Sequence, residues 1–426
     1  MRVYSTQTDQ LADILARKYS ETADVSEVVK KIIERVQQDG DQALYQLIKE
    51  IDHVTLDTLA VSENEIEAAL KGVSPELLKV MEQAKENILS FHQKQVRQGF
   101  VSTEPNGVVM GQRIIPLARV GVYVPGGTAA YPSTVLMDVL PAKIAGVKKI
   151  VMMTPTDSEG NVPAAILAAA SIAGVDEIYK VGGAHGVAAL AYGTETIPKV
   201  DKIVGPGNIY VATAKRMVYG EVDIDMIAGP SDVLIVADDS ANPRWIAADL
   251  LAQAEHDTLA QAILVTTEET LIEKVQSELE QQLAVLPRKE IAGAAIENTG
   301  KIILVKDLEE AISIANQIAP EHLELSVSEP FALLGKVENA GSVFLGHHTP
   351  EVLGDYFAGP NHTLPTEGTA RFYSPLSVDD FIKKSSYLYY TEEAMKEAAS
   401  AVELFAETED LIGHARSMKV RRGEEA

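Results

Sequence analysis

The spacing of apolar residues predicts a helical region at the start of the chain. Between Val25 and Val36, valines and isoleucines recur every three or four positions, which is typical of one helix face, and Asp39-Gly40-Asp41 ends the run. Ser74-Pro75 has the order of an N-cap followed by proline at the first helical position, and it predicts a second long helix. Residues 1–100 are therefore expected to be mainly helical.

Further along, runs rich in valine and isoleucine alternate with helical patterns. The strands predicted in this first series are 113–124, 149–153, 177–181 and 201–204. The helices predicted between and after them are 133–145, 163–173, 184–192 and 208–218. Repeated strand–helix units of this kind predict a parallel sheet flanked by helices.

A second alternating series follows Gly229-Pro230-Ser231 and predicts another sheet. Its strands are expected at 232–237, 261–266, 301–305, 323–326 and 342–345. The fold class predicted is therefore α/β, with two Rossmann-like parallel-sheet domains, a helical N-terminal region and a small C-terminal extension. The expected boundaries are an N-terminal arm at 1–24, a first α/β domain from 25–118 and 230–370, a second α/β domain at 119–229, and a C-terminal segment at 371–426.

The C-terminal segment combines a polar, aromatic linker with a helix from Thr391. It is too short to bury a core of its own, so we expect it to dock on another surface.

Composition narrows the class of protein. The 426 residues carry 37 Lys and Arg against 62 Asp and Glu, a net charge of -25. Nucleic acids and anionic membranes require basic patches, so neither is expected as a partner. The most apolar run, 162–175, is interrupted by Pro163 and Gly174 and falls short of the roughly 20 residues of a membrane span. The sequence has no cysteine and begins without a secretory pattern, which fits a soluble cytoplasmic protein.

Two stretches concentrate side chains that can carry chemistry. Pro320-Glu321-His322-Leu323 places a carboxylate beside an imidazole, directly after a helix-breaking proline. The segment 354–362 carries Asp355 and His362 in a glycine- and proline-rich setting, where side chains often face ligands. With Gln253, His256 and His414 they form a set of nitrogen and oxygen donors that suits zinc. A surface or packing role remains open for each of these residues alone. His53, His92, His347 and His348 lack such a setting and are interpreted as structural.

Four turns contain glycines at predicted strand ends. They are Pro125-Gly126-Gly127, Gly182-Gly183-Ala184-His185, Gly205-Pro206-Gly207-Asn208 and Gly229-Pro230-Ser231. Ligands of open parallel sheets bind beyond the carboxyl ends of strands, where helix N-termini attract anions. A tight turn is the commoner reason for any single one of these glycines, and none is a full G-x-G-x-x-G. Together, at successive strand ends, they leave two interpretations open: a phosphate or dinucleotide cleft, or a series of tight turns.

Several of these strings, taken in order, resemble the L-histidinol dehydrogenase family. The resemblance covers nearly the whole chain and rests on the motifs 119–127, 204–208, 228–231, 253–256, 319–323, 354–365 and 414–416. It implies oxidation of L-histidinol to L-histidine through histidinaldehyde, with two NAD, as the last step of histidine biosynthesis. It also implies one zinc per subunit and a homodimer whose C-terminal segment completes the partner's site.

The resemblance also implies a role for individual residues. Glu321 and His322 match the acid–base pair, and Gln253, His256, Asp355 and His414 match the zinc ligands. The substrate contacts fall on these metal positions, on His322, and on Ser231, His362 and Glu409. Tyr123 and Asn208 match NAD contacts, whereas His185 stands where the family usually has glutamine. Imidazole can donate one hydrogen bond but lacks the paired donor and acceptor of an amide, so His185 implies a different contact with the cofactor.

The absence of cysteine shapes the expected reaction. Without a thiol, the intermediate aldehyde cannot be held as a thiohemiacetal, and water must attack it to form a hydrate. His322, which titrates near neutral pH, is suited to accept the alcohol proton, and Glu321 is suited to activate the water. Three alternatives stay open from the residues: a paralogous dehydrogenase of another small polyol or amino alcohol, a zinc hydrolase, and a noncatalytic nucleotide- or metal-binding protein.

Overall fold

A computed structural model describes residues 1–16, 24–126 and 130–423 of the chain. Two compact units can be distinguished by their contacts: residues 1–95 with 117–381, and residues 96–116 with 382–426. Of the expected turn residues, Gly127 lies outside the described part.

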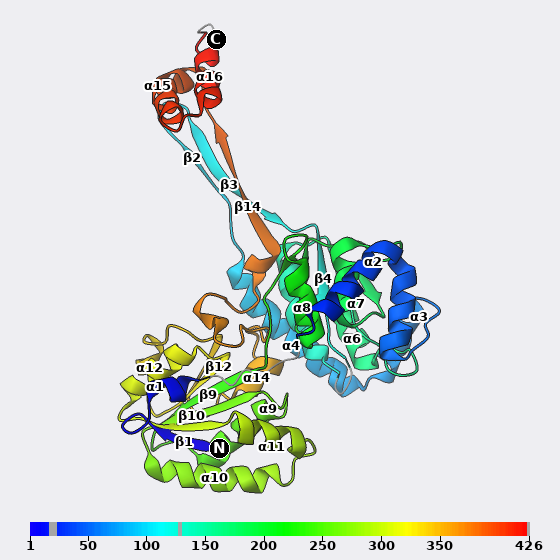
Figure 1. Ribbon diagram of the computed structural model, residues 1–426, viewed down its shortest axis with the longest axis vertical. Helices are drawn as coiled ribbons and strands as arrows, with labels where there is room; N and C mark the ends of the chain where they lie inside the picture. The colour runs from blue at the N-terminus through cyan, green and yellow to red at the C-terminus, as the bar shows by residue number, and fades with distance from the viewer. Residues whose placement is uncertain (17–23, 127–129, 424–426) are drawn as a thin grey trace. The chain divides into compact units, whose positions relative to one another are not determined.

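The larger unit contains two parallel sheets. The first sheet is built from β1 and from the strands of the second alternating series (Figure 1). Its strand order is β1 (Arg2–Ser5), β11 (Lys301–Leu304), β10 (Gln261–Thr266), β9 (Asp232–Ala237), β12 (His322–Ser326) and β13 (Ser342–Leu345). On one side the core includes residues of α9 (Pro243–Ala254), α10 (Glu269–Leu283) and α11 (Lys289–Asn298). The core on the other side includes residues of α1 (Leu11–Leu15), α12 (Leu308–Ile318) and α13 (Pro330–Leu334).

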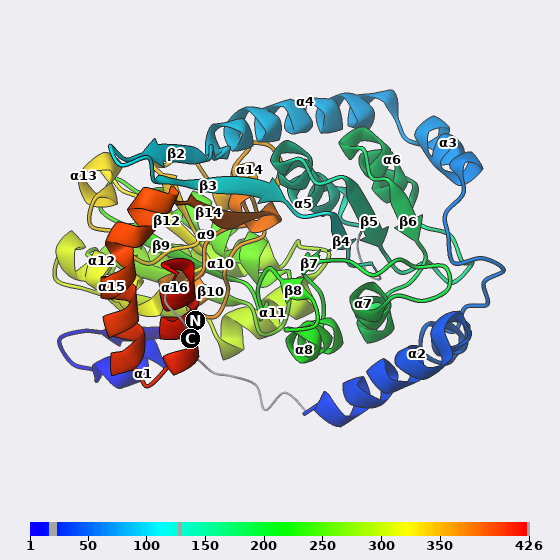
Figure 2. The same cartoon turned by 90° about the horizontal axis from the view of Figure 1, so that it is seen from above.

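A second parallel sheet in the same unit is built from the first alternating series. Its order is β6 (Glu177–Tyr179), β5 (Lys149–Met153), β4 (Arg119–Tyr123), β7 (Lys202–Val204) and β8 (Asp223–Ile224). Figure 2 shows α5 (Pro132–Ala145) and α6 (Ala164–Ala173) on one side and α7 (Gly183–Tyr192) and α8 (Ile209–Val218) on the other. Two parallel sheets flanked by helices confirm the predicted fold class.

The N-terminal helices pack on this second sheet. α2 (Ser26–Leu47) shares a core with α7 and α8, and α4 (Pro75–His92) shares one with α5 and α6. The short α3 (Glu63–Gly72) contributes Ala69 to the latter core. The packing of these helices on the second sheet differs from the expected grouping of 25–118 with 230–370. The apolar stripe of a helix predicts that the stripe is buried, but it does not specify against which sheet. Gly40 breaks the helical geometry of α2 with φ +52°, where the sequence predicts the end of a helix.

The expected arm at 1–24, of which residues 17–23 lie outside the described part, differs from a simple arm at its start. β1 pairs in parallel with β11, so Arg2–Ser5 form an edge strand of the first sheet. The predicted helical character of residues 1–100 is therefore wrong at this strand. The pairing joins residues about 300 positions apart, and the short polar pattern of the strand gives no local sign of it.

The smaller unit is an antiparallel sheet followed by two helices. The sheet order is β14 (Ile382–Tyr389), β3 (Val109–Pro116) and β2 (Phe100–Thr103), and the helices are α15 (Glu392–Thr408) and α16 (Ile412–Arg421). The expected strand at 113–124 is thus two strands, β3 and β4, in different units. The expected linker after residue 371 forms β14, which begins only at Ile382. Both differences arise from long-range pairing of β3 with β14, which local patterns do not reveal.

The remaining elements are short. They are α14 (Glu351–Tyr356) and the single turns Ile48–Asp52, Gln93–Gln95, Thr369–Arg371 and Val378–Phe381. Within the described ranges, none of the helices combines the length and apolar character that crossing a membrane requires.

Candidate active site

Glu321 and His322 lie at the amino end of β12, beside the amino end of β9. Helix α12 ends at Ile318, and Ala319 adopts φ +53° before Pro320 prevents the helix from continuing. The chain then enters β12 at His322, whose register partner in β9 is Val233. Both Glu321 and His322 are buried. The helix stop therefore sets the pair at the start of a central strand.

Asp232 holds this pair in place. Its Oδ1 accepts a hydrogen bond of 2.6 Å from the Glu321 backbone N–H, while its own N–H donates to Glu321 Oε2 at 3.0 Å. The Asp232 carbonyl oxygen lies 3.2 Å from His322 Nδ1. One residue at the start of β9 thus fixes both members of the predicted acid–base pair.

Carboxylates surround the His322 imidazole. Its Nε2 lies 3.4 Å from Asp355 Oδ1, and its Nδ1 lies 3.9 Å from Glu321 Oε2 and 3.8 Å from Glu351 Oε2. Burial by itself lowers the pKa of His322, but the charges of Glu321, Asp355 and Glu351 outweigh it and raise the pKa well above the ordinary value. His322 therefore binds a proton tightly, and its pKa lies above the near-neutral value that the sequence predicts.

The two acids beside His322 are tuned in opposite directions. Burial raises the pKa of Glu321 to about 7, although the His322 charge opposes the rise. Burial also acts to raise the pKa of Asp355, but hydrogen bonding and charge from His322, with smaller contributions from His362 and His256, keep it below the usual value. Near neutral pH the site can thus hold an ionised Asp355 together with a Glu321 that readily gains or loses a proton.

A further group of buried acids lies behind His322, and the motifs do not reveal it. Burial raises the pKa of Glu351 well above normal and that of Glu324 to about 8, with Asp249 adding to the rise at Glu324. Glu324 Oε1 accepts the Glu351 backbone N–H at 2.8 Å. A signal was available at two acidic positions, because Asp232 begins a strand that is otherwise apolar and Glu324 stands between Leu323 and Leu325.

The expected metal ligands are divided between the two units. Gln253 is buried near the end of α9, His256 follows that helix, and Asp355 lies in α14 close enough to interact electrostatically with His256. His414 is an exposed residue of α16 in the smaller unit. In the described ranges, no group of three or more His, Cys, Asp or Glu side chains has an arrangement that would bind a metal.

The expected substrate residues follow the same division. Ser231 directly precedes β9 and its carbonyl accepts the Gln261 N–H at 3.0 Å. His362 Nδ1 bonds to the Asp355 carbonyl oxygen at 2.9 Å. Ser231 therefore adjoins Asp232 in the chain, and His362 contacts Asp355. Glu409 is exposed at the end of α15 in the smaller unit.

The glycine turns occupy different edges of the two sheets. Gly126, Gly182-Gly183 and Gly205 follow β4, β6 and β7, at the carboxyl ends that the rule for open sheets specifies. Gly229-Pro230-Ser231 instead directly precedes β9, so its expected position at a carboxyl end is wrong. The connection from β8 to β9 contains no helix, and the turn therefore leads into a strand. The Glu321–His322 pair lies at the amino end of the strands of the first sheet.

Two of the expected cofactor residues lie at these carboxyl-end turns. The Tyr123 hydroxyl accepts the Gly183 N–H at 3.0 Å, and burial raises its pKa to about 12. Asn208 is the N-cap of α8, where its Oδ1 accepts from the backbone of Tyr210 and Val211 at 3.0 and 3.2 Å. Both side chains thus shape turns next to helix N-termini.

His185 is buried in the first turn of α7. Its Nε2 lies 3.6 Å from Asp52 Oδ2, and neither ring nitrogen has a hydrogen-bond partner among the described residues. Asp52 ends the turn Ile48–Asp52, which follows α2. The imidazole of His185 therefore lies close to a carboxylate of another segment.

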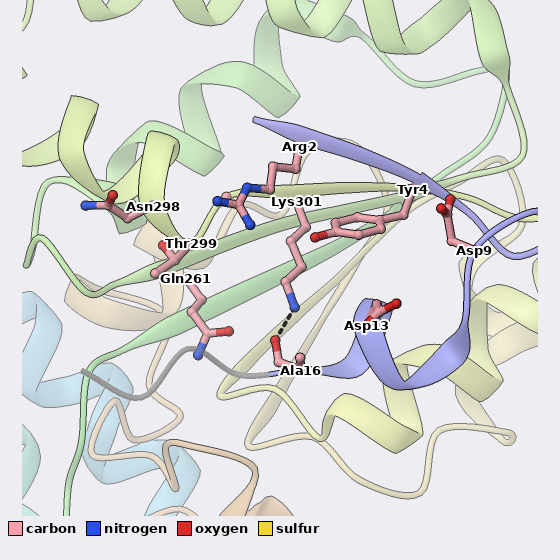
Figure 3. A pocket seen from close by; sticks show the side chains of 10 residues that line it. Arg2, Tyr4, Asp9, Asp13, Ala16, Gln261, Asn298, Thr299 and Lys301 are labelled. Carbon is pink, nitrogen blue, oxygen red and sulfur yellow. Dashed lines mark hydrogen bonds between the residues drawn. The ribbon is translucent and has the colours of Figure 1, made fainter. Parts of the chain in front are cut away.

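A cavity of about 300 Å³ lies elsewhere, where β1 meets β11 (Figure 3). Figure 3 shows Lys301 extended toward the carbonyl oxygen of Ala16, to which it donates a hydrogen bond. Arg2 and Gln261 also line the cavity, but none of the expected site residues does. This cavity is therefore separate from the Glu321–His322 pair.

Comparisons with known proteins agree with the geometry. A family model described as histidinol dehydrogenase matches residues 15–422. A histidinol dehydrogenase of Listeria monocytogenes serovar 1/2a is 57% identical over 401 residues, covering 94% of each chain. One of Clostridium acetobutylicum is 56% identical over 405 residues, covering 95% of this chain and 94% of that protein.

A solved structure shows the same likeness in three dimensions. The crystal structure of histidinol dehydrogenase from Elizabethkingia anophelis matches with a TM-score of 0.95 at 40% identity, covering 99% of this chain and 98% of that one. The match extends over both sheets and over the segment carrying Glu321 and His322. Because the sequence and the fold agree over nearly the entire length, this chain belongs to the histidinol dehydrogenase family.

Proposed function

We propose that this protein oxidises L-histidinol to L-histidine through histidinaldehyde, using two NAD, in the last step of histidine biosynthesis. The observation that carries the proposal is the buried His322 with Asp355 on one ring nitrogen and Glu321 near the other. Family membership supports the choice of substrate. The same pair of residues supplies the proton acceptors that an alcohol-to-acid oxidation requires.

His322 acts first in the proposed sequence. The surrounding carboxylates raise its proton affinity, so the imidazole, once it has released its own proton, readily takes the proton of the substrate hydroxyl. Asp355, held ionised, orients the ring and stabilises the imidazolium that forms. Bound NAD supplies the hydride acceptor.

Glu321 acts in the second oxidation. Its pKa of about 7 leaves a large ionised fraction at neutral pH, and that carboxylate takes a proton from the water that attacks the aldehyde. The two hydrogen bonds with Asp232 keep the carboxylate oriented. The absence of cysteine from the sequence is consistent with a route through a hydrate.

We propose Gln253, His256, Asp355 and His414 as ligands of one zinc ion per subunit. Their amide, imidazole and carboxylate donors fit that metal, and Asp355 already interacts with His256. When bound, zinc supplies a fixed positive charge that orients the amino alcohol. The proposed substrate contacts are the four zinc ligands together with Ser231, His322, His362 and Glu409. The proposed NAD contacts are Tyr123, His185 and Asn208.

We also propose a homodimer in which the C-terminal segment completes the partner's site. The smaller unit exposes large apolar side chains on its strands and its helices, among them Val101 and Leu388 at 64% and 65% exposure and Phe405 at 74%. Such a surface is typical of one that another chain covers. His414 and Glu409 would enter the site from that segment.

The test is an absorbance assay at 340 nm with L-histidinol and NAD. Formation of two NADH per histidine is expected. No NADH formation with histidinol contradicts the proposal, and activity restricted to other amino alcohols or polyols indicates a paralogous specificity. Hydrolysis without any nicotinamide requirement would instead identify a zinc hydrolase.

A further inference from the structure

The loop that carries His362 is bonded to helix α5 of the second sheet. The Asn361 side-chain amide donates to the Met137 carbonyl oxygen at 2.7 Å. The Thr363 hydroxyl donates to Asp138 Oδ1 at 2.6 Å, and both Thr363 and Asp138 are buried. The residues on either side of His362 are thus attached to two consecutive positions of one helix.

The other oxygen of Asp138 faces the turn at Gly205. Oδ2 has no hydrogen-bond partner in the described part of the chain, and a Cβ built on Gly205 would lie 3.1 Å from it. The same Cβ would lie only 2.1 Å from the Tyr123 carbonyl oxygen, which is a clash. The φ angle of Gly205 is +108°, which side chains rarely adopt. Only glycine fits in this position, between the carboxylate and the end of β4.

A buried ion pair holds the two peptide groups on either side of the Gly205 Cα. The Gly205 N–H donates to Asp225 Oδ2 at 2.8 Å, and the Gly205 carbonyl oxygen accepts from Lys215 Nζ at 2.8 Å. Lys215 and Asp225 form an ion pair, and their side chains are only 2% and 1% exposed. Gly205 begins the turn that ends at Asn208, so this network sets the geometry of the expected cofactor turn.

We propose that Asp138 is a positioning residue that sets the substrate loop at His362 relative to the cofactor turn at 205–208. One carboxylate oxygen anchors Thr363 and the other faces Gly205, so this one buried side chain lies between the two segments and spaces them. The inference rests on the proposed function, because it takes His362 to contact histidinol and Asn208 to contact NAD.

The energetics of this carboxyl group support a role beyond stability. Burial raises the pKa of Asp138 to about 7; the Thr363 hydrogen bond opposes the rise, Asp225 adds to it and Lys215 opposes it. A buried acid with one unbonded oxygen is a poor choice for stability alone, because apolar groups of the same shape avoid its desolvation cost.

The test is a set of steady-state and binding measurements on three threonine variants. Thr363→Val removes the hydroxyl that anchors the loop, Thr363→Ser retains it, and Thr299→Val is the matched control. Thr299 is also buried, but its hydroxyl bonds to the backbone carbonyl oxygens of Ala260 and Ala295, beside the first sheet. We expect Thr363→Val to raise KM for histidinol about tenfold with kcat less affected, as loss of a hydrogen bond to a charged group does. Thr363→Ser and Thr299→Val are expected to stay within about twofold of the parent.

A second variant tests the cofactor side. Asp138→Ala removes both contacts, and we expect it to raise KM for histidinol and also the Kd of NAD measured by calorimetry, whereas Thr363→Val leaves that Kd unchanged. A folded Thr363→Val protein with unchanged KM overturns the inference, as does an equal effect of Thr299→Val. Absence of histidinol-dependent NADH formation in the parent contradicts the proposed function itself, which distinguishes the two failures.

Discussion

Asp232 and Glu321 bind each other through two reciprocal hydrogen bonds, one from each backbone N–H to the other side chain. The pair joins the amino ends of β9 and β12 and leaves the Glu321 carboxylate next to His322. This arrangement explains how a buried acid with a raised pKa keeps a defined orientation. It also makes the proposed roles of Glu321 and His322 testable.

Glu321→Gln should slow mainly the second oxidation. The amide oxygen can still accept the Asp232 N–H, so the fold is retained, but the amide cannot take a proton from water. A loss of at least about a hundredfold in aldehyde oxidation is expected for removal of a general base. Supplying histidinaldehyde directly isolates this step; a normal rate with that substrate would refute the assignment.

His322→Asn should slow the first oxidation instead. The variant removes the proton acceptor that Asp355 orients, so alcohol oxidation is expected to fall by about 10²–10⁴. Single-turnover measurements with histidinol and excess NAD report this step. His348→Asn, at an exposed histidine packed on Trp245, is the matched control and should be unaffected. Equal losses in both variants would count against the role of His322.

The proposed zinc site predicts a metal content of one per subunit. His414→Asn and His256→Asn should each lower the zinc retained after dialysis, because each removes one of four donors. Elemental analysis of the dialysed protein measures this without reference to activity. Full occupancy in the His414→Asn protein would remove that residue from the ligand set, and a chelator should reproduce the loss in the parent.

Gly205→Ala should be more harmful than Gly220→Ala. Both glycines have positive φ, +108° and +103°, so both substitutions introduce backbone strain of about 1–2 kcal/mol. Only at Gly205 would the added Cβ meet backbone, 2.1 Å from the Tyr123 carbonyl oxygen, whereas nothing lies within 4 Å at Gly220. Urea unfolding should show a clearly larger loss for Gly205→Ala, together with weaker NAD binding. Equal destabilisation by the two substitutions would contradict the described packing.

Stability should depend on pH through Glu324. Its pKa is raised to about 8 in the folded chain, mainly by burial, so the folded state holds this proton more tightly than the unfolded state. The stabilisation that comes from holding this proton is fully present below the unfolded-state pKa, near 4. It is lost as the pH rises toward 8. Glu324→Gln, which can still accept the Glu351 N–H, should therefore gain stability over the parent between pH 5 and 8, by on the order of 1 kcal/mol or more.

The measurement is urea denaturation of both proteins at several pH values. Glu297→Gln, at an exposed position of α11, is the control and should leave the pH dependence unchanged. Parallel stability curves for Glu324→Gln and the parent would show that Glu324 does not hold a proton in the folded state near neutral pH.

Much of the larger unit was predictable because its strands carry a local signal. β5, β9, β10 and β13 have the bounds that their apolar runs predict, since strands buried on both faces consist of nearly continuous Val, Ile and Leu. β1, β2 and β14 were missed because they are short or exposed, and partners distant in sequence define them. The packing of α2 on the second sheet likewise depends on which sheet lies nearby.

The sequence by itself determined the chemical inventory: an adjacent Glu321 and His322 after a helix stop, nitrogen and oxygen donors, no thiol, and motifs resembling one family. The tertiary structure decided how those groups are tuned. It placed Asp232, Glu351 and Asp355 around the pair and buried the Glu321 carboxylate. It also brought Asp138 close to both Thr363 and Gly205. Desolvation and charge proximity depend on distances between residues far apart in the chain, and only folding sets those distances.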